Sequence, residues 1–316
     1  MEKVLILGGS YFIGKHVVHT LKDNYDVYVL NRGSNPFNDE HINELKADRN
    51  ELTQMQAVLS NIMFDYVVDI SGYTEPHLHH VLESMNSSAL KNYVFISTSA
   101  VYDISAKRPP FKEDDPLGGD SPFKTYAENK IACEAYLFKT LNKDQITIFR
   151  PPFVYGPDNY IYRERLMFMF IEANQEIFIP QSNNQILFVY VKDLALQMKE
   201  AIEGIIPPGI YNVGNQYPVT FSQWVSMCED VVNQKTEITF IDPKDFKVNV
   251  TAFFPFFDYD NVLSVDKIKQ YSPTETPMLE GLKEAYNDYL TVKNTLKKPK
   301  RIDESYGLIQ SLRNVK

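Results

Sequence analysis

The chain has 316 residues, of which 44% are hydrophobic and 23% charged, and it carries a formal net charge of −9 at pH 7. This composition is typical of a globular protein with a sizeable core, and the acidic balance disfavours a nucleic-acid surface, because phosphate contacts need clustered Lys and Arg. The apolar runs are shorter than the ~20 residues of a membrane span, no secretory leader precedes the first strand, and the two cysteines suggest neither a disulfide framework nor a zinc site, so we expect a cytoplasmic protein with no membrane, nucleic-acid or metal partner.

The first half of the chain alternates predicted strands with predicted helices. Apolar runs predict strands at 3–7, 27–30, 66–70, 93–97 and 146–149, and helical periodicity predicts helices at 14–21, 52–59, 75–85 and 123–141. Nearly continuous apolar strands joined by helices indicate a parallel sheet covered on both faces. We therefore predict an α/β fold built on a doubly wound parallel sheet.

The alternation breaks after Arg150. Proline pairs, aromatic-rich loops and short elements at 210–213, 221–232 and 238–241 predict a smaller C-terminal α/β subdomain. The run 187–191, followed by the amphipathic segment 194–202, indicates one more strand and helix added to the first sheet. We expect a first domain over 1–155 to which 186–205 returns, a substrate subdomain over 156–185 and 206–295, and a solvated basic tail over 296–316.

A glycine-rich turn follows the first predicted strand. Gly8 and Gly14 belong to the run Gly-Gly-Ser-Tyr-Phe-Ile-Gly, in which Tyr11 stands where the usual spacing Gly-x-x-Gly-x-x-Gly has its middle glycine. A strand, a tight glycine turn and a helix N-terminus cradle a pyrophosphate, since backbone N–H groups and the helix dipole face the phosphates. The motif predicts a Rossmann dinucleotide-binding domain, and Tyr11 is expected to adopt the geometry of the turn. The expected cofactor contacts here are Gly8, Ser10, Tyr11, Phe12 and Ile13.

Tyr126 and Lys130 form a Tyr-x-x-x-Lys pair whose spacing places both side chains on one face of a predicted helix. An ammonium beside a phenol lowers the ordinary phenol pKa of ~10, so the phenolate can act as a general base. The same spacing recurs in the chain by chance, but Tyr126 opens the helix after the fourth strand. Thr98, at the end of that strand, offers a hydroxyl for the same substrate oxygen. The alternative is a surface tyrosine and a turn hydroxyl.

Six ordered motifs carry the functional signal together. They are Gly-Gly-x-x-Phe-Ile-Gly at 8–14, Ser-Thr-x-x-Val-Tyr at 97–102, Tyr-x-x-x-Lys at 126–130, Arg-Pro-Pro-x-Val-Tyr-Gly-Pro at 150–157, Phe-Val-Tyr-Val-x-Asp-Leu-Ala at 188–195 and Tyr-Asn-Val-Gly at 211–214. In this order they resemble the extended short-chain dehydrogenase/reductases, the NAD-dependent epimerase/dehydratase family. The resemblance implies an epimerase or reductase that transfers hydride between a nicotinamide cofactor and a sugar or nucleotide sugar.

The resemblance also implies roles for individual residues. Tyr126 would exchange a proton with a substrate hydroxyl, and Lys130 would lower the pKa of Tyr126 and hold the nicotinamide ribose. Thr98, with Ser99 as the fallback, would position the substrate oxygen. The segment 151–154, and Phe153 within it, would lie by the nicotinamide. Ser71, Gly72 and Tyr73 would cover the adenosine side.

Departures from the family pattern refine the cofactor and the chemistry. Relatives that dehydrate carry Asp-Glu after the threonine, where this chain has Ser-Ala, so dehydration is disfavoured. The second strand ends in Asn31 and Arg32 instead of an acidic residue, and Arg32 can pair with a 2′-phosphate, which favours NADP over NAD. A solvent-facing Arg32 is the alternative. Asp48 matches the aspartate that contacts the adenine amino group in the family, and Arg49 is a candidate second phosphate partner.

The substrate side departs further from the family. Many nucleotide-sugar members carry a diphosphate-binding arginine where this chain has Ile186. Arg163 and Arg165 are the nearest candidates for another cation, and an internal ion pair with Glu164 is the alternative. The pattern resembles the atypical branch of the family, which includes uncharacterised bacterial epimerase-like proteins and chloroplast stem-loop RNA-binding proteins. The expected substrate contacts are Ser99, Tyr155, Asn159 and Arg163.

Two further functions stay open, a non-catalytic NADP-binding regulator or redox sensor and an RNA-binding member of the atypical branch. The intact Tyr-x-x-x-Lys pair argues against the sensor, and the acidic charge argues against RNA. The resemblance suggests a homodimer packed through the helix of Tyr126, with Cys133, Tyr136 and Leu137 on that face. His77, His79 and His80 are expected on an exposed helix face, and a metal site is disfavoured because no carboxylate or cysteine framework is near.

Overall fold

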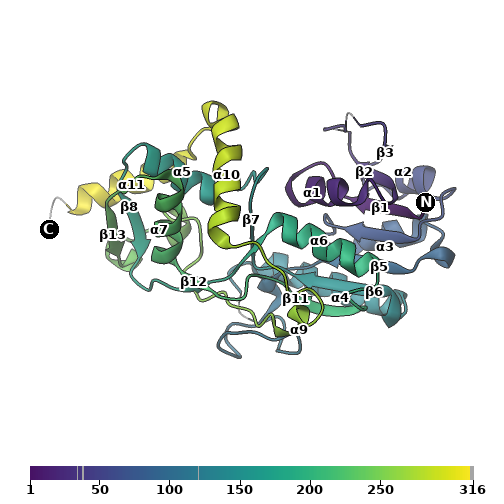
Figure 1. The fold of residues 1–316 in the computed structure, drawn as a ribbon. Coiled ribbons are helices and arrows are strands. Elements are labelled where there is room, and N and C mark those ends of the chain that lie inside the picture. Colours follow the sequence, from purple (N-terminus) through teal and green to yellow (C-terminus); the bar gives the residue numbers. More distant parts are fainter. Residues whose placement is uncertain (34, 38, 120, 314–316) are drawn as a thin grey trace. The chain divides into compact units, whose positions relative to one another are not determined.

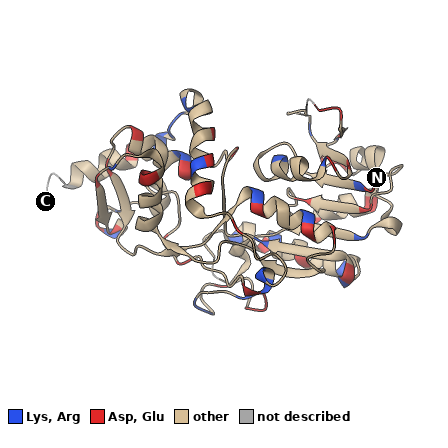
Figure 2. Ribbon diagram, in the orientation of Figure 1, with Lys and Arg blue, Asp and Glu red and all other residues tan. Residues whose placement is uncertain are grey.

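The computed structural model describes residues 1–33, 35–37, 39–119 and 121–313 (Figure 1). The chain divides into two compact units. The first unit consists of Met1–Val154, Val189–Gln216 and Leu263–Glu275, and the second of Tyr155–Phe188, Tyr217–Val262 and Thr276–Lys316. Figure 2 shows acidic and basic residues mixed along the helices of both units. Among the described helices, none is both long enough and hydrophobic enough to cross a lipid bilayer.

A seven-stranded parallel sheet forms the centre of the first unit. Its strands are β1 (Lys3–Leu7), β2 (Asp26–Asn31), β3 (Ile42–Lys46), β4 (Tyr66–Asp69), β5 (Asn92–Ile96), β6 (Ile146–Arg150) and β11 (Gly209–Asn212). They lie in the order β11-β6-β5-β4-β1-β2-β3 and pair in parallel throughout. The order reverses between β1 and β4, and the carboxyl ends of two such strands frame a ligand crevice. The doubly wound α/β prediction is therefore confirmed.

Helices cover both faces of the sheet (Figure 1). The helices α1 (Phe12–Leu21) and α6 (Val191–Ile202) pack together on one face, and α2 (Leu52–Leu59), α3 (Glu75–Ser84) and α4 (Lys124–Thr140) cover the other. Each residue of β5 is buried, because side chains on both of its faces meet a helix layer. The core against α2, α3 and α4 joins strand residues such as Leu5, Val67 and Phe95 to helix residues such as Leu78 and Leu137.

Two strand predictions differ from the structure. The edge strand β3 was not predicted, because its sequence Ile-Asn-Glu-Leu-Lys is mostly polar and its side chains are largely exposed. The run at 187–191 does not join the large sheet, since its strand β10 (Phe188–Tyr190) pairs instead with β7 (Phe153–Tyr155). The strand that extends the sheet is β11, which pairs with β6 and which we had expected in the second subdomain.

The second unit is smaller and mixed. Its helices are α5 (Glu164–Glu172), α7 (Phe221–Val232), α8 (Pro243–Phe246), α10 (Met278–Val292) and α11 (Lys300–Arg313). The strand β13 (Ile238–Ile241) pairs in parallel with β8 (Ile177–Pro180), and β12 (Val219–Thr220) pairs antiparallel with β9 (Gln185–Ile186). Phe188, Phe254 and Phe256 pack around the buried Trp224, so the aromatic run at 253–259 contributes to the core of this unit.

The C-terminal segment is helical over 300–313, so the prediction of a solvated tail is wrong there, and 314–316 lie outside the described residues. Ile302, Tyr306 and Ile309 of α11 are buried at helical spacing, and Tyr306 packs against Phe170 and Phe178. Asp303 and Glu304 of α11 are exposed, and Lys298, which precedes the helix, pairs with Asp303 at 2.6 Å. The apolar residues Ile302, Tyr306 and Ile309 recur every three to four residues after the basic cluster, and this periodicity is the signal that would have predicted the helix.

Candidate functional site

The glycine turn after β1 packs too tightly for side chains. A Cβ atom on Gly14 would stand 2.1 Å from the carbonyl oxygen of Gly8, and Gly8 itself has φ of +90° and lies against Ser71 after β4. The turn therefore brings backbone against backbone where α1 begins, and the first N–H groups of a helix are not used by its own hydrogen bonds. This geometry fits the pyrophosphate of a dinucleotide, which needs close backbone approach at a helix N-terminus.

Tyr11 does not take the unusual backbone conformation that its position predicted. Its φ of −134° is ordinary extended backbone, its side chain is 54% exposed, and its carbonyl oxygen accepts the Gly14 N–H at 2.9 Å. The positive φ falls on Phe12 instead, at 37°, and the Phe12 ring is buried. The missing middle glycine is thus accommodated by strain one residue later, while the Tyr11 side chain stays in solvent at the turn.

The end of β2 is tied to the glycine turn. Asn31 donates from Nδ2 to Ser10 Oγ at 2.9 Å, and its Oδ1 accepts the Gly33 N–H at 2.6 Å. Arg32, between Asn31 and Gly33 in the sequence, is exposed. The backbone and side-chain amides of Asn50 hold the pKa of Asp48 below its usual range, and the Arg32 charge lowers it further. The structure therefore places Arg32 and Asp48 close enough for their charges to interact.

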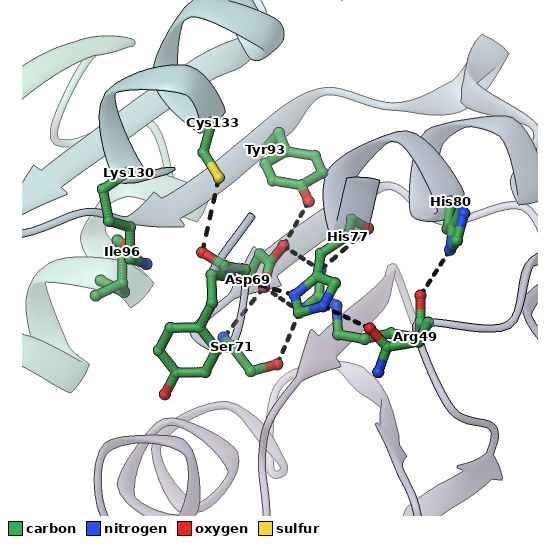
Figure 3. A network of polar contacts seen from close by, with 12 residues as sticks. Arg49, Asp69, Ser71, His77, His80, Tyr93, Ile96, Lys130 and Cys133 are labelled. Carbon is green, nitrogen blue, oxygen red and sulfur yellow. Dashed lines mark hydrogen bonds and ion pairs between the residues drawn. The ribbon is translucent and has the colours of Figure 1, made fainter. Parts of the chain in front are cut away.

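Arg49 is buried and turned inward, so the structure does not support its expected role as a phosphate partner. Its Nη1 and Nη2 each lie 2.9 Å from an oxygen of Asp69, at the carboxyl end of β4 (Figure 3). Nη1 also donates to Ser71 Oγ at 2.8 Å, and the Tyr93 hydroxyl donates to Asp69 at 2.8 Å. Burial disfavours the charged form of Asp69, but the Arg49 charge and these hydrogen bonds outweigh it, so its pKa lies below the usual range.

Lys130 lies on the same helix face as Tyr126, and its side chain is buried. Its Nζ donates to the carbonyl oxygen of Ile96 at 2.6 Å and lies 5.9 Å from the centroid of the Tyr126 ring. Burial lowers the pKa of Lys130 to about 8, and the Asp69 carboxylate opposes that shift. Tyr126 is half-buried. The predicted pair is therefore brought together at the carboxyl end of β5.

The helix that carries this pair is anchored to the sheet. Glu134, one turn after Lys130, accepts two hydrogen bonds from Arg150 of β6, at 3.0 Å from Nε and at 2.6 Å from Nη2. Both side chains are buried. A bidentate, charge-assisted pair of this kind fixes orientation as well as distance.

Thr98 and its neighbours lie at the end of β5. Thr98 Oγ1 accepts the Ala100 N–H at 3.2 Å and so caps the short 3-10 turn η2 (Ser99–Val101). Thr98 and Ser99 are both buried, at 9% and 8% exposed. Just before β7, the carbonyl oxygen of Pro151 accepts the Ser99 N–H at 2.8 Å. Phe153, in β7, is buried at 6% exposed.

The expected substrate residues after position 154 belong to the second unit. Tyr155 is fully buried, with its ring edge-on to Phe188. Asn159 is also fully buried, and its amide is used internally, since Nδ2 donates to Glu164 at 2.8 Å and Oδ1 accepts the Ile161 N–H. These contacts argue against a substrate role for Asn159.

The arginines of this segment have different environments. Arg165 pairs with Asp288 of α10 at 2.8 Å and is buried, so it is not available as a diphosphate-binding cation. Glu164 accepts hydrogen bonds from neutral groups, and burial raises its pKa while the Arg163 charge opposes that shift, so the internal ion pair that we considered as the alternative concerns Arg163 and not Arg165. Arg163 is half-buried and remains the candidate.

Two expectations about helix faces are only partly met. His79 is exposed as expected and pairs with Glu83 at 3.0 Å. His77 and His80 are half-buried instead: His77 Nε2 bonds Asn50 Oδ1 at 3.0 Å, and His80 Nδ1 bonds the Arg49 carbonyl at 2.8 Å. Cys133 and Leu137 are fully buried in their own core and cannot form a dimer face, whereas Tyr136 is half-exposed. The loop before α2 covers the histidine face of α3, and the core against the sheet takes up the Cys133 face of α4. The helical pattern alone did not show which faces are covered.

Sequence reasoning missed Asp69 and Phe95. An aspartate that ends the apolar strand Tyr-Val-Val-Asp was the available signal, because a buried carboxylate needs a cation or several donors. Its partner Arg49 lies 20 residues earlier, on another loop, so the pairing itself could not be read from spacing. Phe95 gave no signal, since it resembles any other core aromatic in β5.

Similarity to known proteins agrees with this geometry. A chloroplast stem-loop binding protein of 41 kDa from Arabidopsis thaliana is 30% identical over 310 residues, which cover 90% of this chain and 79% of the relative. An N-acetyl-α-D-glucosaminyl-diphospho-ditrans,octacis-undecaprenol 4-epimerase from Escherichia coli O157:H7 is 24% identical over 250 residues, covering 74% of this chain and 73% of that protein.

Solved structures share the fold. The UDP-glucose 4-epimerase of Thermotoga maritima, solved with UDP-glucose, matches with a TM-score of 0.75 at 20% identity over 92% of this chain and 99% of that one. The Bordetella bronchiseptica enzyme WbmH, solved with NAD+, matches with a TM-score of 0.75 at 18% identity and the same coverage. The model of the NAD dependent epimerase/dehydratase family matches residues 4–214. The chain therefore belongs to the NAD dependent epimerase/dehydratase family.

Proposed function

We propose that this protein is an NAD(P)-dependent epimerase or reductase that acts on a sugar or nucleotide sugar. The observation that carries the proposal is the pair on α4, in which a buried Lys130 lies beside a half-buried Tyr126 in the same unit as the glycine turn. Relatives named as a UDP-glucose 4-epimerase, a dTDP-D-glucose 4,6-dehydratase and a 4-epimerase of an N-acetylglucosaminyl-diphospho-undecaprenol support the substrate class. A nicotinamide cofactor, when bound, would accept or return a hydride at the substrate carbon.

The residues of this chain supply the proton chemistry. Tyr126 removes the proton from a substrate hydroxyl as its carbon is oxidised and returns it in the reverse step. Lys130 favours the phenolate of Tyr126 by its charge, because an ammonium nearby stabilises the ionised phenol. The hydroxyl of Thr98, with Ser99 next to it, orients the substrate oxygen. The Ser-Ala sequence after Thr98 leaves no acid and base for water loss at that position, so we infer that the enzyme does not dehydrate its substrate.

We infer a preference for NADP over NAD. Arg32 follows β2 and is exposed, and an arginine at this position can bind a 2′-phosphate through two parallel hydrogen bonds. The relatives include enzymes solved with NAD, so the preference is a property we assign to this chain from Arg32 and not from them. Gly8, Ser10, Phe12 and Ile13 would contact the pyrophosphate, Asn31 and Asp48 the adenosine half, and Phe153 the nicotinamide.

Arg163 is the substrate-binding cation that we propose in the second unit. It stands at the start of α5 and is half-buried, and its charge also acts on the buried Glu164 next to it in the sequence. Tyr155 is fully buried against Phe188, so it would support the substrate site only through packing. A diphosphate substrate is expected to bind more weakly when Arg163 is replaced by Ala. We keep the cytoplasm and a homodimer as predictions of the sequence.

The test is a panel of nucleotide sugars incubated with the protein and NAD+ or NADP+, with epimer formation followed by NMR and cofactor reduction by absorbance. Wild type should convert at least one sugar, and Tyr126→Phe should lower that rate by about 10²–10⁴-fold, the usual contribution of a positioned acid or base. The chain contains a matched control, because Tyr289 and Lys293 have the same spacing but both bind Glu172 in the second unit. Tyr289→Phe should leave the rate within about twofold, since that pair serves packing.

The same experiment separates the alternatives. A protein that binds NADP+ but converts no sugar is the regulator or redox sensor. A protein that binds neither nucleotide but retains a stem-loop RNA on a filter would support the RNA-binding alternative, in line with the name of the stem-loop binding relative from Arabidopsis thaliana. The net charge of −9 favours the enzyme over that outcome.

A further inference from the structure

Three aromatic rings surround the side-chain nitrogen of Lys130. Its Nζ lies 4.6 Å from the centroid of the Phe95 ring, 5.3 Å from that of Tyr73 and 5.9 Å from that of Tyr126. An ammonium within about 6 Å of a ring centroid is attracted to the negative face of the ring. Lys130 is only 1% exposed, so these rings, together with the Ile96 carbonyl, enclose it in an aromatic cage.

The walls of this aromatic cage differ in exposure. Phe95 is fully buried in β5 and closes the cage on the side of the sheet. Tyr73 is 47% exposed, and Tyr126 is half-buried. Their ring centroids lie 6.4 Å apart. Tyr73 and Tyr126 are therefore the rings that stand between Lys130 and solvent, and Tyr73 is the one without a role in the proposed chemistry.

The turn that carries Tyr73 is held by several contacts (Figure 3). The Ser71 N–H donates to Asp69 Oδ1 at 3.1 Å, and the Tyr73 N–H donates to His77 Nδ1 at 3.3 Å. A Cβ atom on Gly72 would stand 2.8 Å from Asp69, Leu78 and Phe95 atoms alike, so the turn fits closely against β4 and β5. The direction of the Tyr73 side chain is thus set by a fixed backbone.

We propose that Tyr73 is a positioning residue for the reaction at Tyr126, because its ring closes the aromatic cage and keeps water from Lys130. The proposal rests on the proposed function, in which Lys130 acts through the Tyr126 phenol. A charge acts more strongly on its neighbour when little water lies between them. The burial that lowers the pKa of Lys130 to about 8 agrees with this arrangement. Tyr73 would therefore belong with the catalytic pair and not with the adenosine side.

The test is the titration of Lys130 in the cofactor-free protein. Lysines labelled with ¹³C at Cε are followed by NMR from pH 6 to pH 11, and the Lys130 signal is identified by its absence from Lys130→Arg. Tyr73→Phe keeps the ring and should keep the wild-type titration. Tyr73→Ala admits water and should raise the pKa of Lys130 by about one or more, because burial is what lowers it. Tyr217→Ala, which removes a 73%-exposed tyrosine of the second unit, should change nothing.

Two outcomes overturn the proposal. One is the same Lys130 titration in Tyr73→Ala as in wild type, and the other is a pKa that falls in Tyr73→Ala, since the ring would then act by attraction and not by excluding water. If Tyr73→Ala is unfolded by circular dichroism, Tyr73→Leu replaces it, with the same expected direction because leucine covers less of Lys130 than a ring does. The titration of Lys130 needs neither cofactor nor substrate. A wild type that binds no nicotinamide dinucleotide would refute the proposed function, whereas the Lys130 titration in Tyr73→Ala would still decide whether Tyr73 excludes water from Lys130.

Discussion

Asp69→Asn tests the buried centre of the first unit. Asp69 is fully buried and accepts hydrogen bonds from both terminal nitrogens of Arg49, from the Tyr93 hydroxyl and from the Ser71 N–H. Asparagine has nearly the same shape, but it carries no charge and turns one of its two acceptors into a donor. The substitution therefore leaves the buried Arg49 guanidinium without a counter-charge. The amide N–H groups of the new side chain would also face the Arg49, Tyr93 and Ser71 groups that donate hydrogen bonds to this position.

The magnitude follows from the burial of this pair. Removing one partner of a buried ion pair costs about 3–5 kcal/mol, because the other charge remains desolvated and uncompensated. In a unit of this size, about 1 kcal/mol corresponds to about 2–4 °C in Tm. Asp69→Asn should accordingly lower the Tm of the first unit by about 6–20 °C at pH 7.

The assay is thermal unfolding followed by circular dichroism and calorimetry, with Asp65→Asn as the matched control. Asp65 precedes the same strand and pairs with Lys91 at 3.0 Å, but its side chain is 24% exposed. A partly solvated pair of this kind contributes about 1 kcal/mol or less, so the control should lose only a few degrees. Equal losses in Asp69→Asn and Asp65→Asn would refute the reasoning, since the buried carboxylate with its four hydrogen bonds should cost more to neutralise than the partly solvated one.

The effect of Asp69→Asn also depends on pH in a defined direction. The folded-state pKa of Asp69 is depressed, mainly because the Arg49 charge and hydrogen bonds outweigh burial. Its contribution is therefore complete above the unfolded value of ~3.9 and is lost as pH falls through the lower folded value. The stability gap between wild type and Asp69→Asn should be constant from pH 8 to pH 5 and should narrow below pH 4.

Three further predictions concern separate features. Arg32→Ala should weaken NADP+ binding about tenfold or more and NAD+ binding much less, measured by calorimetric titration, and equal losses would refute the 2′-phosphate role. Burial, and then the Arg49 charge, lower the pKa of His77, so its contribution to stability is present above the unfolded value of ~6.5 and declines at lower pH. His77→Asn keeps an acceptor for the Tyr73 N–H and should show a smaller loss of urea stability between pH 7.5 and pH 5.5 than wild type, whereas an identical loss would contradict the assignment. Gly307→Ala in α11 should stabilise the second unit by about 0.5–1 kcal/mol in urea, because an added Cβ meets nothing within 4 Å, and any destabilisation would contradict this.

The sequence predicted the central sheet well where local pattern decides structure. Nearly every residue of the strands β1, β4, β5 and β6 is buried because helices cover both faces, and the apolar runs within them are visible in the sequence. The helix α2 begins and ends where its periodicity predicts, and α7 has the bounds of the short element expected at 221–232. The edge strand β3 could not be predicted in this way, since one exposed face removes the apolar run.

Non-local packing explains what remained hidden. The spacing of Tyr126 and Lys130 is local to one helix, so their proximity could be predicted. The inward turn of Arg49 depends on Asp69 in a neighbouring strand, and the ring of Tyr73 near Lys130 depends on the fixed turn after β4. The strained backbone at Phe12 in place of Tyr11 depends on how the glycine turn packs against β4. Each of these features joins segments whose contact no motif encodes.

The most direct test of the central claim is a calorimetric titration of the purified protein with NAD+ and with NADP+. Wild type should bind at least one of them with micromolar or tighter affinity, about 8 kcal/mol of binding free energy. Tyr126→Phe should bind equally well, and Gly14→Val should not bind, because its side chain would collide with the Gly8 carbonyl oxygen 2.1 Å from the added Cβ. Absence of binding of both nucleotides to folded wild-type protein would contradict the account.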